Sequence, residues 1–205
     1  MRAILTPEER ARLQRSAAID PAAHDAYLRG RFEFRQRSRD GFAAAIRHYE
    51  TAISIDPDFA PPYAGIVHVY TLSAGFLHLP PRTAVPPARA AAVKALEIDA
   101  GLADAHVSLG FIYFRYDYDF PRAESAFKQA IAFNPSADQA HLWYGLSLGW
   151  AGRFDEARAE MDRAKLLVPL STAILGSDGW LHYFARHYQR AIAVFDEAIA
   201  VVASS

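Results

Sequence analysis

The clearest pattern along the chain is a set of small and large apolar residues that recurs at a fixed spacing. Each copy has an alanine, a large residue or alanine four positions later, a second alanine after three more, and proline or alanine five further on. The five copies are Ala45-Tyr49-Ala52-Pro57, Ala88-Ala92-Ala95-Ala100, Ala123-Phe127-Ala130-Pro135, Ala157-Met161-Ala164-Pro169 and Ala191-Phe195-Ala198-Ala203. Their ends are separated by 43, 35, 34 and 34 residues, which predicts a protein built from repeats.

This spacing predicts a helix in each copy. Steps of four and three place the side chains on one helical face, where the small alanines let a neighbouring helix approach closely. The proline then ends the helix. A further packing residue precedes each first alanine by three positions: Phe42, Val85, Phe120, Phe154 and Tyr188.

A second helix is expected before each of these, because Gly110, Gly145 and Gly179 lie 35 and 34 residues apart within aromatic-rich runs. Gly110 precedes its alanine by 13 residues, whereas the other two precede theirs by 12. The third repeat is therefore expected to carry a single insertion between its helices. The second repeat is expected to have a long inter-helix loop at about 77–85, and the first a shorter insertion at about 37–40.

The pattern resembles the tetratricopeptide repeat (TPR). The fourth copy carries it most fully, with Tyr144-Gly145, Leu148, Gly152-Arg153-Phe154, Ala157, Met161, Ala164 and Pro169. The resemblance implies an all-α fold, an α-solenoid of about five helix-turn-helix repeats in a right-handed superhelix. The expected repeats are 23–58, 59–101, 102–136, 137–170 and 171–205, after a lead-in helix and linker at 1–22. Ala100, Leu148, His182 and Ala203 depart from the family pattern.

Three phrases are similar to a narrower group, namely Tyr27-Leu28-Arg29-Gly30-Arg31, Ala60-Pro61-Pro62-Tyr63-Ala64-Gly65 and Asp117-Tyr118-Asp119-Phe120. They resemble the carboxy-terminal TPR regions of bacterial winged-helix transcriptional regulators, adenylate/guanylate cyclases and serine/threonine kinases. No residues of those other domains are found, so a detached array or a fragment is expected.

The two ends of the array carry different signals. Thr6, Pro7 and Glu9 favour a short amino-terminal helix through capping and a favourable charge near the helix dipole. At the other end, apolar residues fall on more than one face of the last helix: Ile192, Val194, Ile199, Val201 and Val202. Since repeat arrays normally finish with a polar face, we expect the native chain to continue there or the edge to pack against another subunit.

Composition limits the remaining function classes. The 205 residues are 52% hydrophobic, and 22 Lys+Arg against 23 Asp+Glu leave a net charge of −1. The balance gives no general preference for nucleic acid or membranes. The chain has no cysteine, which removes disulfides, thiolate zinc sites and cysteine nucleophiles and fits a cytoplasmic location. No secretion signal is expected, and prolines and polar residues interrupt the uncharged stretch at 59–81, which favours packing over membrane insertion.

No motif for chemistry stands out. The eight histidines lack metal-ligand spacing, and His106 and His141 share a repeat position, which favours packing. Asp117 and Asp119 fall at a turn without a phosphate-binding loop. No nucleophilic arrangement is present, so we expect no enzyme, no cofactor and no metal. Five arginines between 29 and 39, with two phenylalanines among them, could bind nucleic acid or an acidic or phosphorylated peptide, although a solvated helix face is favoured.

Aromatic residues of the first helices are the stronger candidate for a binding site. In the TPR frame, the inner groove would be lined by Phe111, Phe114, Trp143, Leu146, Trp150, Trp180, Tyr183 and Phe184. Large aromatics supply much of the binding energy at interfaces. The alternative is that several of them pack between neighbouring first helices. The Lys/Asn clamp of chaperone-binding arrays is not visible, because Lys94, Lys128 and Lys165 all fall on second helices.

Three functions remain open from the sequence. The first is a protein-interaction scaffold or regulatory module that binds a peptide, a helix or a parent signalling domain in the aromatic groove. The second is a structural array that forms homo-oligomers through its carboxy-terminal edge. The third is an accessory domain of a signalling enzyme. The first two differ in the expected partner, which is another protein in one and a second copy in the other.

Overall fold

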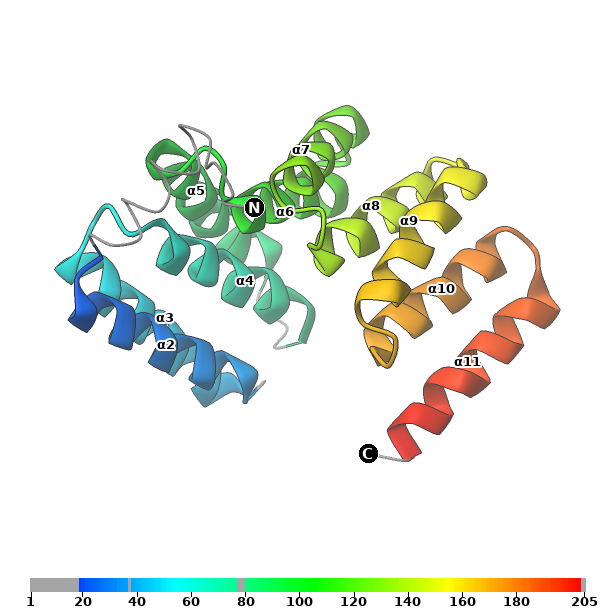
Figure 1. Cartoon of the computed structure of the whole chain (residues 1–205), viewed down its shortest axis with the longest axis horizontal. Helices are drawn as coiled ribbons and strands as arrows, with labels where there is room; N and C mark the ends of the chain where they lie inside the picture. The colour runs from blue at the N-terminus through cyan, green and yellow to red at the C-terminus, as the bar shows by residue number, and fades with distance from the viewer. Residues whose placement is uncertain (1–18, 37, 77–79, 204–205) are drawn as a thin grey trace, which may run out of the picture. The chain divides into compact units, whose positions relative to one another are not determined.

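The computed structural model describes residues 19–36, 38–76 and 80–203, with side chains described up to Thr71 in the second stretch. The described residues form ten α-helices and one π-helical turn, which Figure 1 shows in chain order. They are α2 (Pro21–Arg35), α3 (Arg39–Ile55), α4 (Ala60–Phe76), α5 (Pro81–Ile98), α6 (Ala103–Ile112), η1 (Tyr113–Asp117), α7 (Phe120–Phe133), α8 (Asp138–Trp150), α9 (Phe154–Leu167), α10 (Thr172–Phe184) and α11 (Tyr188–Ala203). The amino-terminal helix predicted from Thr6, Pro7 and Glu9 lies outside the described residues.

The helices pack as consecutive pairs in two units. In the first unit, which ends at Ala100, α2 packs with α3 and α4 with α5. In the second unit, which begins at Gly101, the pairs are α6 with α7, α8 with α9, and α10 with α11. Each pair consists of a first helix and a second helix that runs back along it, as the yellow pair α8 and α9 shows in Figure 1. The all-α fold of five helix pairs predicted from the sequence is therefore confirmed.

In the third and fifth pairs, the second helix packs on its first helix where the first helix has glycine. A Cβ built on Gly110 would lie 2.6 Å from the ring of Phe127, and one built on Gly179 would lie 2.5 Å from the ring of Phe195. Glycine is required at both positions, because a methyl group at that distance would overlap the ring. The aromatic residue of the repeated pattern on the second helix thus packs against the glycine of the first helix.

Tyr49 makes the same contact with two glycines at once. Cβ atoms built on Gly30 of α2 and Gly65 of α4 would lie 2.5 Å and 2.6 Å from its ring. The sequence interpretation did not use these glycines, although their separation of 35 residues repeats the spacing of the later ones. In the fourth pair methionine replaces the ring, and α8 approaches α9 so closely that a Cβ on Gly145 would meet the backbone oxygen of Ala157 at 3.1 Å.

The turn between the two helices of a pair uses a left-handed residue in the last three repeats. Tyr118, Gly152 and Arg186 have φ values of 56°, 77° and 61°, and they lie 34 residues apart. Only glycine adopts this conformation without steric cost, because the Cβ of other residues approaches the following carbonyl. Because the three turns share one register, Tyr118 and Arg186 adopt a strained conformation that favours glycine.

The single insertion predicted in the third repeat is found at the end of its first helix. There the backbone forms the π-helical turn η1 before the left-handed Tyr118, and the Tyr118 N–H donates to the carbonyl oxygen of Tyr113. A π turn accommodates one additional residue without ending the helix. The extra residue is therefore absorbed by the helix, and the register of α7 is kept.

The prediction of a long loop at about 77–85 is wrong from Pro81 onward, because α5 already begins there. Pro86 and Pro87 lie inside this helix, although proline removes a backbone donor and usually breaks a helix interior. Ala84 and Ala88 are both 1% exposed, so the turn before the prolines is held by the same buried face as the rest of α5. Burial of that face offsets the helix-breaking effect. Likewise, residues 39 and 40 of the insertion expected in the first repeat belong to α3.

Side chains with oxygen atoms cap several of these helices. The Asp20 carboxylate accepts a hydrogen bond from the Ala22 N–H at 2.7 Å, and the Ser38 hydroxyl accepts one from Gly41 at 3.0 Å. Asp119 does the same for Arg122 at 3.1 Å. These bonds satisfy backbone donors that the first helical turn leaves without partners. Among the helices the structure describes, none has the length and apolar character needed to cross a membrane.

Candidate binding surface on the first helices

The eight predicted groove residues separate into packed and exposed groups. Phe114 is buried, and Phe111, Trp143 and Leu146 are partly buried. Phe111 of α6 meets Trp143 of α8 edge to face, with ring centroids 4.5 Å apart. These residues therefore contribute mainly to packing between successive first helices, which was the alternative to binding for each of them.

The exposed group lies on α8 and α10. Trp150, Trp180, Tyr183 and Phe184 are 61%, 52%, 48% and 45% exposed. The rings of Trp150 and Phe184 are 6.1 Å apart, and those of Trp180 and Phe184 are 5.9 Å apart. The structure thus brings four of the predicted residues into one exposed aromatic surface. Their role in binding stays a prediction.

Within this surface, Trp150 and Phe184 form a distinct pair at the last turns of α8 and α10. Trp150 also rests on the buried ring of Phe114 at 6.1 Å, in an edge-to-face arrangement. The contact with Phe114 restricts the Trp150 ring before any ligand binds, so less side-chain entropy would be lost on binding. We refer to Trp150 and Phe184 as the aromatic pair.

Trp180 and Tyr183 face α11 instead. The Trp180 ring lies 5.7 Å from that of Phe195, and the Tyr183 ring lies 5.7 Å from that of Tyr188. Tyr188 was predicted to pack like Phe42, but it is 54% exposed whereas Phe42 is 2% exposed. The apolar surface therefore continues from α10 onto α11, which the groove prediction did not include.

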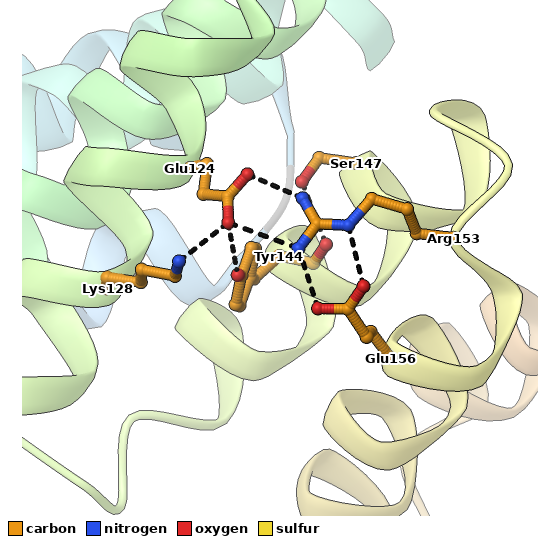
Figure 2. A network of polar contacts seen from close by, with 6 residues as sticks. All are labelled: Glu124, Lys128, Tyr144, Ser147, Arg153 and Glu156. Atoms are coloured by element: carbon orange, nitrogen blue, oxygen red, sulfur yellow. Dashed lines mark hydrogen bonds and ion pairs between the residues drawn. The ribbon is translucent and has the colours of Figure 1, made fainter.

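A polar network joins α7 to the helix pair that follows it (Figure 2). The Glu124 carboxylate of α7 accepts hydrogen bonds from Arg153 at 2.7 Å and from the Tyr144 hydroxyl of α8 at 2.9 Å, and it pairs with Lys128 at 2.7 Å. Arg153 also donates to Glu156 of α9 at 2.6 Å. The Arg153 guanidinium, followed by Lys128, lowers the pKa of Glu124 to about 2.

A second carboxylate, which is buried, links α9 to α10 in the same way. Asp178 of α10 is 2% exposed and lies 2.8 Å from the ammonium group of Lys165, which also pairs with Asp162. The side chain of His182 lies 3.7 Å from Asp178, and burial lowers its pKa. Both networks connect a second helix to the next first helix, so they join successive repeats.

The other residues considered for chemistry have structural partners. His141 is buried, and its ring nitrogens lie 2.6 Å from Glu160 and 3.0 Å from the Pro135 carbonyl, while His106 stacks on Phe133. Asp119 caps α7. Within the described residues, no group of three or more His, Cys, Asp or Glu side chains could hold a metal ion. Neither network carries a sequence motif, which is why both were missed.

Two of the five arginines between residues 29 and 39, and the lysines of the second helices, have partners in the structure. Arg29 pairs with Asp25 at 2.8 Å, and the Arg31 guanidinium lies over the Tyr27 ring. The lysines of the second helices pair with acids as well, as Lys94 does with Glu97 at 3.1 Å. The solvated helix face expected for the arginines stays a prediction.

No protein-family model matches the chain. Among curated proteins, it is similar to the transcriptional regulator HilA of Salmonella typhimurium, with 26% identity over 171 residues. HilA of Salmonella paratyphi A is 25% identical over the same length. The matched region is 83% of this chain but 31% of the regulator, so the chain spans less than a third of these relatives.

Solved structures with the same fold are TPR proteins. The type IV pilus biogenesis factor PilW aligns with a TM-score of 0.71 and 16% identity, over 89% of this chain and 79% of its own. A TPR protein of Thermus thermophilus aligns with a TM-score of 0.63 and 19% identity, over 89% of each chain. YrrB, described as a TPR protein with an unusual peptide-binding site, has a TM-score of 0.54 and 18% identity, over 96% and 92%.

The consecutive helix pairs of the described residues agree with the fold of these neighbours. The chain therefore has the tetratricopeptide-repeat fold.

Proposed function

We propose that this chain is a protein-interaction module that binds an apolar peptide segment or helix on its first helices, with the aromatic pair as the anchor. The observation that carries the proposal is the contact between two large, exposed rings, Trp150 and Phe184, on neighbouring first helices. Exposed aromatic rings in contact are uncommon on a surface without a partner.

The aromatic pair has the properties of an interface anchor. Each ring offers a large apolar area, and the buried Phe114 supports one of them from below. Residues of this type supply most of the binding energy at interfaces, and truncation of one commonly costs about 2 kcal/mol, or about 30-fold in affinity. A ligand that lays one apolar side chain across the two rings would cover both.

The comparisons support the choice of partner. YrrB, a structural neighbour, is described as having a peptide-binding site, and HilA, the sequence relative, is described as a transcriptional regulator. In the proposal the ligand is therefore a segment of a signalling or regulatory protein, which includes a domain of the parent protein. The lack of cysteine is consistent with a cytoplasmic location.

A peptide library displayed on phage tests the proposal directly. Peptides selected on the immobilised chain are synthesised, and their affinities are measured by fluorescence anisotropy. Trp150→Ala and Phe184→Ala are expected to weaken binding about 30-fold each. Phe32→Ala is the matched control, because Phe32 is an aromatic residue of α2 that is 63% exposed. Equal loss in the control and the two variants, or no loss in any of them, would contradict the assignment.

A further inference from the structure

The last repeat has an exposed apolar edge that includes both of its helices. On α11, Tyr188, Ile192, Ile199 and Val202 are 54%, 61%, 65% and 64% exposed, and the partly buried Phe195 lies between them. These five residues follow one another at steps of 4, 3, 4 and 3, which places them along a single helical stripe. Trp180 and Tyr183 of α10 adjoin the stripe through their ring contacts with Phe195 and Tyr188. We call these seven residues the terminal edge.

The corresponding positions of earlier repeats show which helix such a stripe contacts. Counted from the first alanine of each second helix, Ile192 corresponds to Ile46 and Glu124. Ile46 packs in a cluster that includes Val69 of α4, and Glu124 bonds Tyr144 of α8. At this position, therefore, one second helix shares a cluster with the first helix that follows it, and another bonds that helix directly.

The second position of the stripe behaves in the same way. Ile199 corresponds to Ile131 and Lys165. Ile131 packs against clusters that contain residues of α8, and Lys165 bonds Asp178 of α10. In α11 both positions carry isoleucine, and the two side chains are 61% and 65% exposed.

The exposed rings of α10 occupy contact positions as well. Trp180 corresponds to Phe111, whose ring lies 4.5 Å from Trp143 of the next first helix. Tyr183 corresponds to Gly149, where a Cβ would lie 2.4 Å from Leu181 of the next first helix. The terminal edge is thus a complete stacking surface, continuous with the interfaces between the preceding repeats.

We propose that a second copy of this chain covers the terminal edge, in a twofold dimer that pairs the two α11 helices antiparallel. The exposed area supports this occupant. Large side chains present on the order of 200 Å² each, so half-exposure of the edge gives about 700 Å² per copy. Two copies would bury about 1,400 Å², which lies within the range of stable, specific interfaces.

The α11 stripes of two copies are also complementary to each other. It contains no charged residue, so two copies can pair without burying a charge. Antiparallel pairing about Phe195 places Ile192 of one copy opposite Ile199 of the other, and Tyr188 opposite Val202. A twofold contact of this type uses the same surface on both copies and closes at two subunits.

Charge argues against a head-to-tail contact with α2 of another copy. The α2 residue that corresponds to Asp178 is Arg29, which is ion-paired with Asp25 on the helix surface. Placing this pair against the uncharged stripe would remove both charges from water, and the desolvation penalty exceeds the gain from the pair. A twofold contact avoids this penalty.

Sedimentation equilibrium of the 205-residue chain tests the dimer over about a hundred-fold range of concentration. The expected result is a monomer–dimer equilibrium that stops at twice the monomer mass. Ile192→Glu and Ile199→Glu are expected to raise the dimer dissociation constant at least about 100-fold, because each buries a charge in the seam. Leu166→Glu is the matched control, since Leu166 of α9 is 74% exposed and lies outside the edge. It should leave the equilibrium unchanged.

Cysteine cross-linking tests the antiparallel register, because the chain has no cysteine of its own. Mixing an Ile192→Cys chain with a differently tagged Ile199→Cys chain should give mixed disulfide dimers in preference to either homodimer. A chain that stays monomeric at every concentration overturns the proposal. Assemblies that grow beyond the dimer, without the mixed cross-link, also overturn it, in favour of a head-to-tail contact. None of these variants alters the aromatic pair, so peptide binding is tested separately.

Discussion

Three glycine-to-alanine substitutions should have different effects on stability, although the chemical change is the same. Gly152 lies in a turn at φ 77° and Gly176 lies within α10, and no atom lies within 4 Å of a Cβ built on either. Gly110 is buried, and a Cβ there would lie 2.6 Å from the Phe127 ring. The set therefore separates backbone strain, helix propensity and steric overlap.

The magnitudes follow from these environments. Alanine in the left-handed conformation costs about 1–2 kcal/mol, and the lower entropy of its unfolded chain returns about 0.5–1 kcal/mol, so Gly152→Ala should destabilise by about 1 kcal/mol. Gly176→Ala should stabilise by about 1 kcal/mol, because alanine is the better helix former. Gly110→Ala should destabilise by about 1–3 kcal/mol through overpacking. Arg186→Gly, at the corresponding turn, should be neutral or stabilising.

Urea denaturation followed by far-UV circular dichroism measures these differences, with an unchanged slope as the condition for comparing midpoints. A change of about 1 kcal/mol corresponds to about 2–4 °C in Tm for a chain of this length. Destabilisation by Gly176→Ala similar to that by Gly152→Ala would refute the reasoning, since both substitutions meet empty space and only the backbone conformation distinguishes them.

Three further predictions concern the contacts between and within repeats. Because the pKa of Glu124 is lowered in the folded chain, its carboxylate contributes fully to the free energy of unfolding above about pH 4.5. This contribution is lost as the pH falls toward about 2. With allowance for solvent screening, the contribution amounts to about 1–2 kcal/mol. Urea midpoints of the native chain and Glu124→Gln should therefore converge as the pH is lowered, and a constant difference would contradict the assignment. Asp178→Leu should cost about 2 kcal/mol because it leaves Lys165 partly buried with Asp162 alone, and Lys165→Met in the same chain should restore most of the loss in a double-mutant cycle. Met161→Phe, which restores the aromatic residue found in three other repeats, should destabilise by about 1–3 kcal/mol in thermal denaturation, because α8 and α9 approach too closely for a ring; stabilisation would show that the repeat pattern outweighs local packing.

The sequence predicted the helix pairs well because their signal is local and repeated. The spacing of Ala123, Phe127 and Ala130 specifies one face of a helix wherever it occurs, and the glycine register shows where a second helix must approach. The same reasoning failed for the loop expected at about 77–85, because α5 begins at Pro81. Buried alanines on both sides of Pro86 and Pro87 keep this helix intact, although proline disfavours a helix interior.

The candidate site was predicted less well, because exposure depends on neighbours that the sequence does not locate. Phe114 and Trp150 belong to the same predicted groove, yet one is 5% and the other 61% exposed. Tyr188 shares a repeat position with the buried Phe42, and its exposure follows from its place in the last described repeat. A repeat position predicts which way a side chain faces, but the adjoining helix decides whether that face is covered.

The amino-acid sequence by itself determined the fold class, the number of helix pairs and the register of the glycines in the later first helices, because each depends on residue types at short, repeated spacings. The tertiary structure decided which rings are exposed, which carboxylates join one repeat to the next, and how the additional residue of the third repeat is accommodated. The physical reason is that these features depend on distances between helices. Such distances are set by the packing of many side chains together, which the spacing along one helix does not specify.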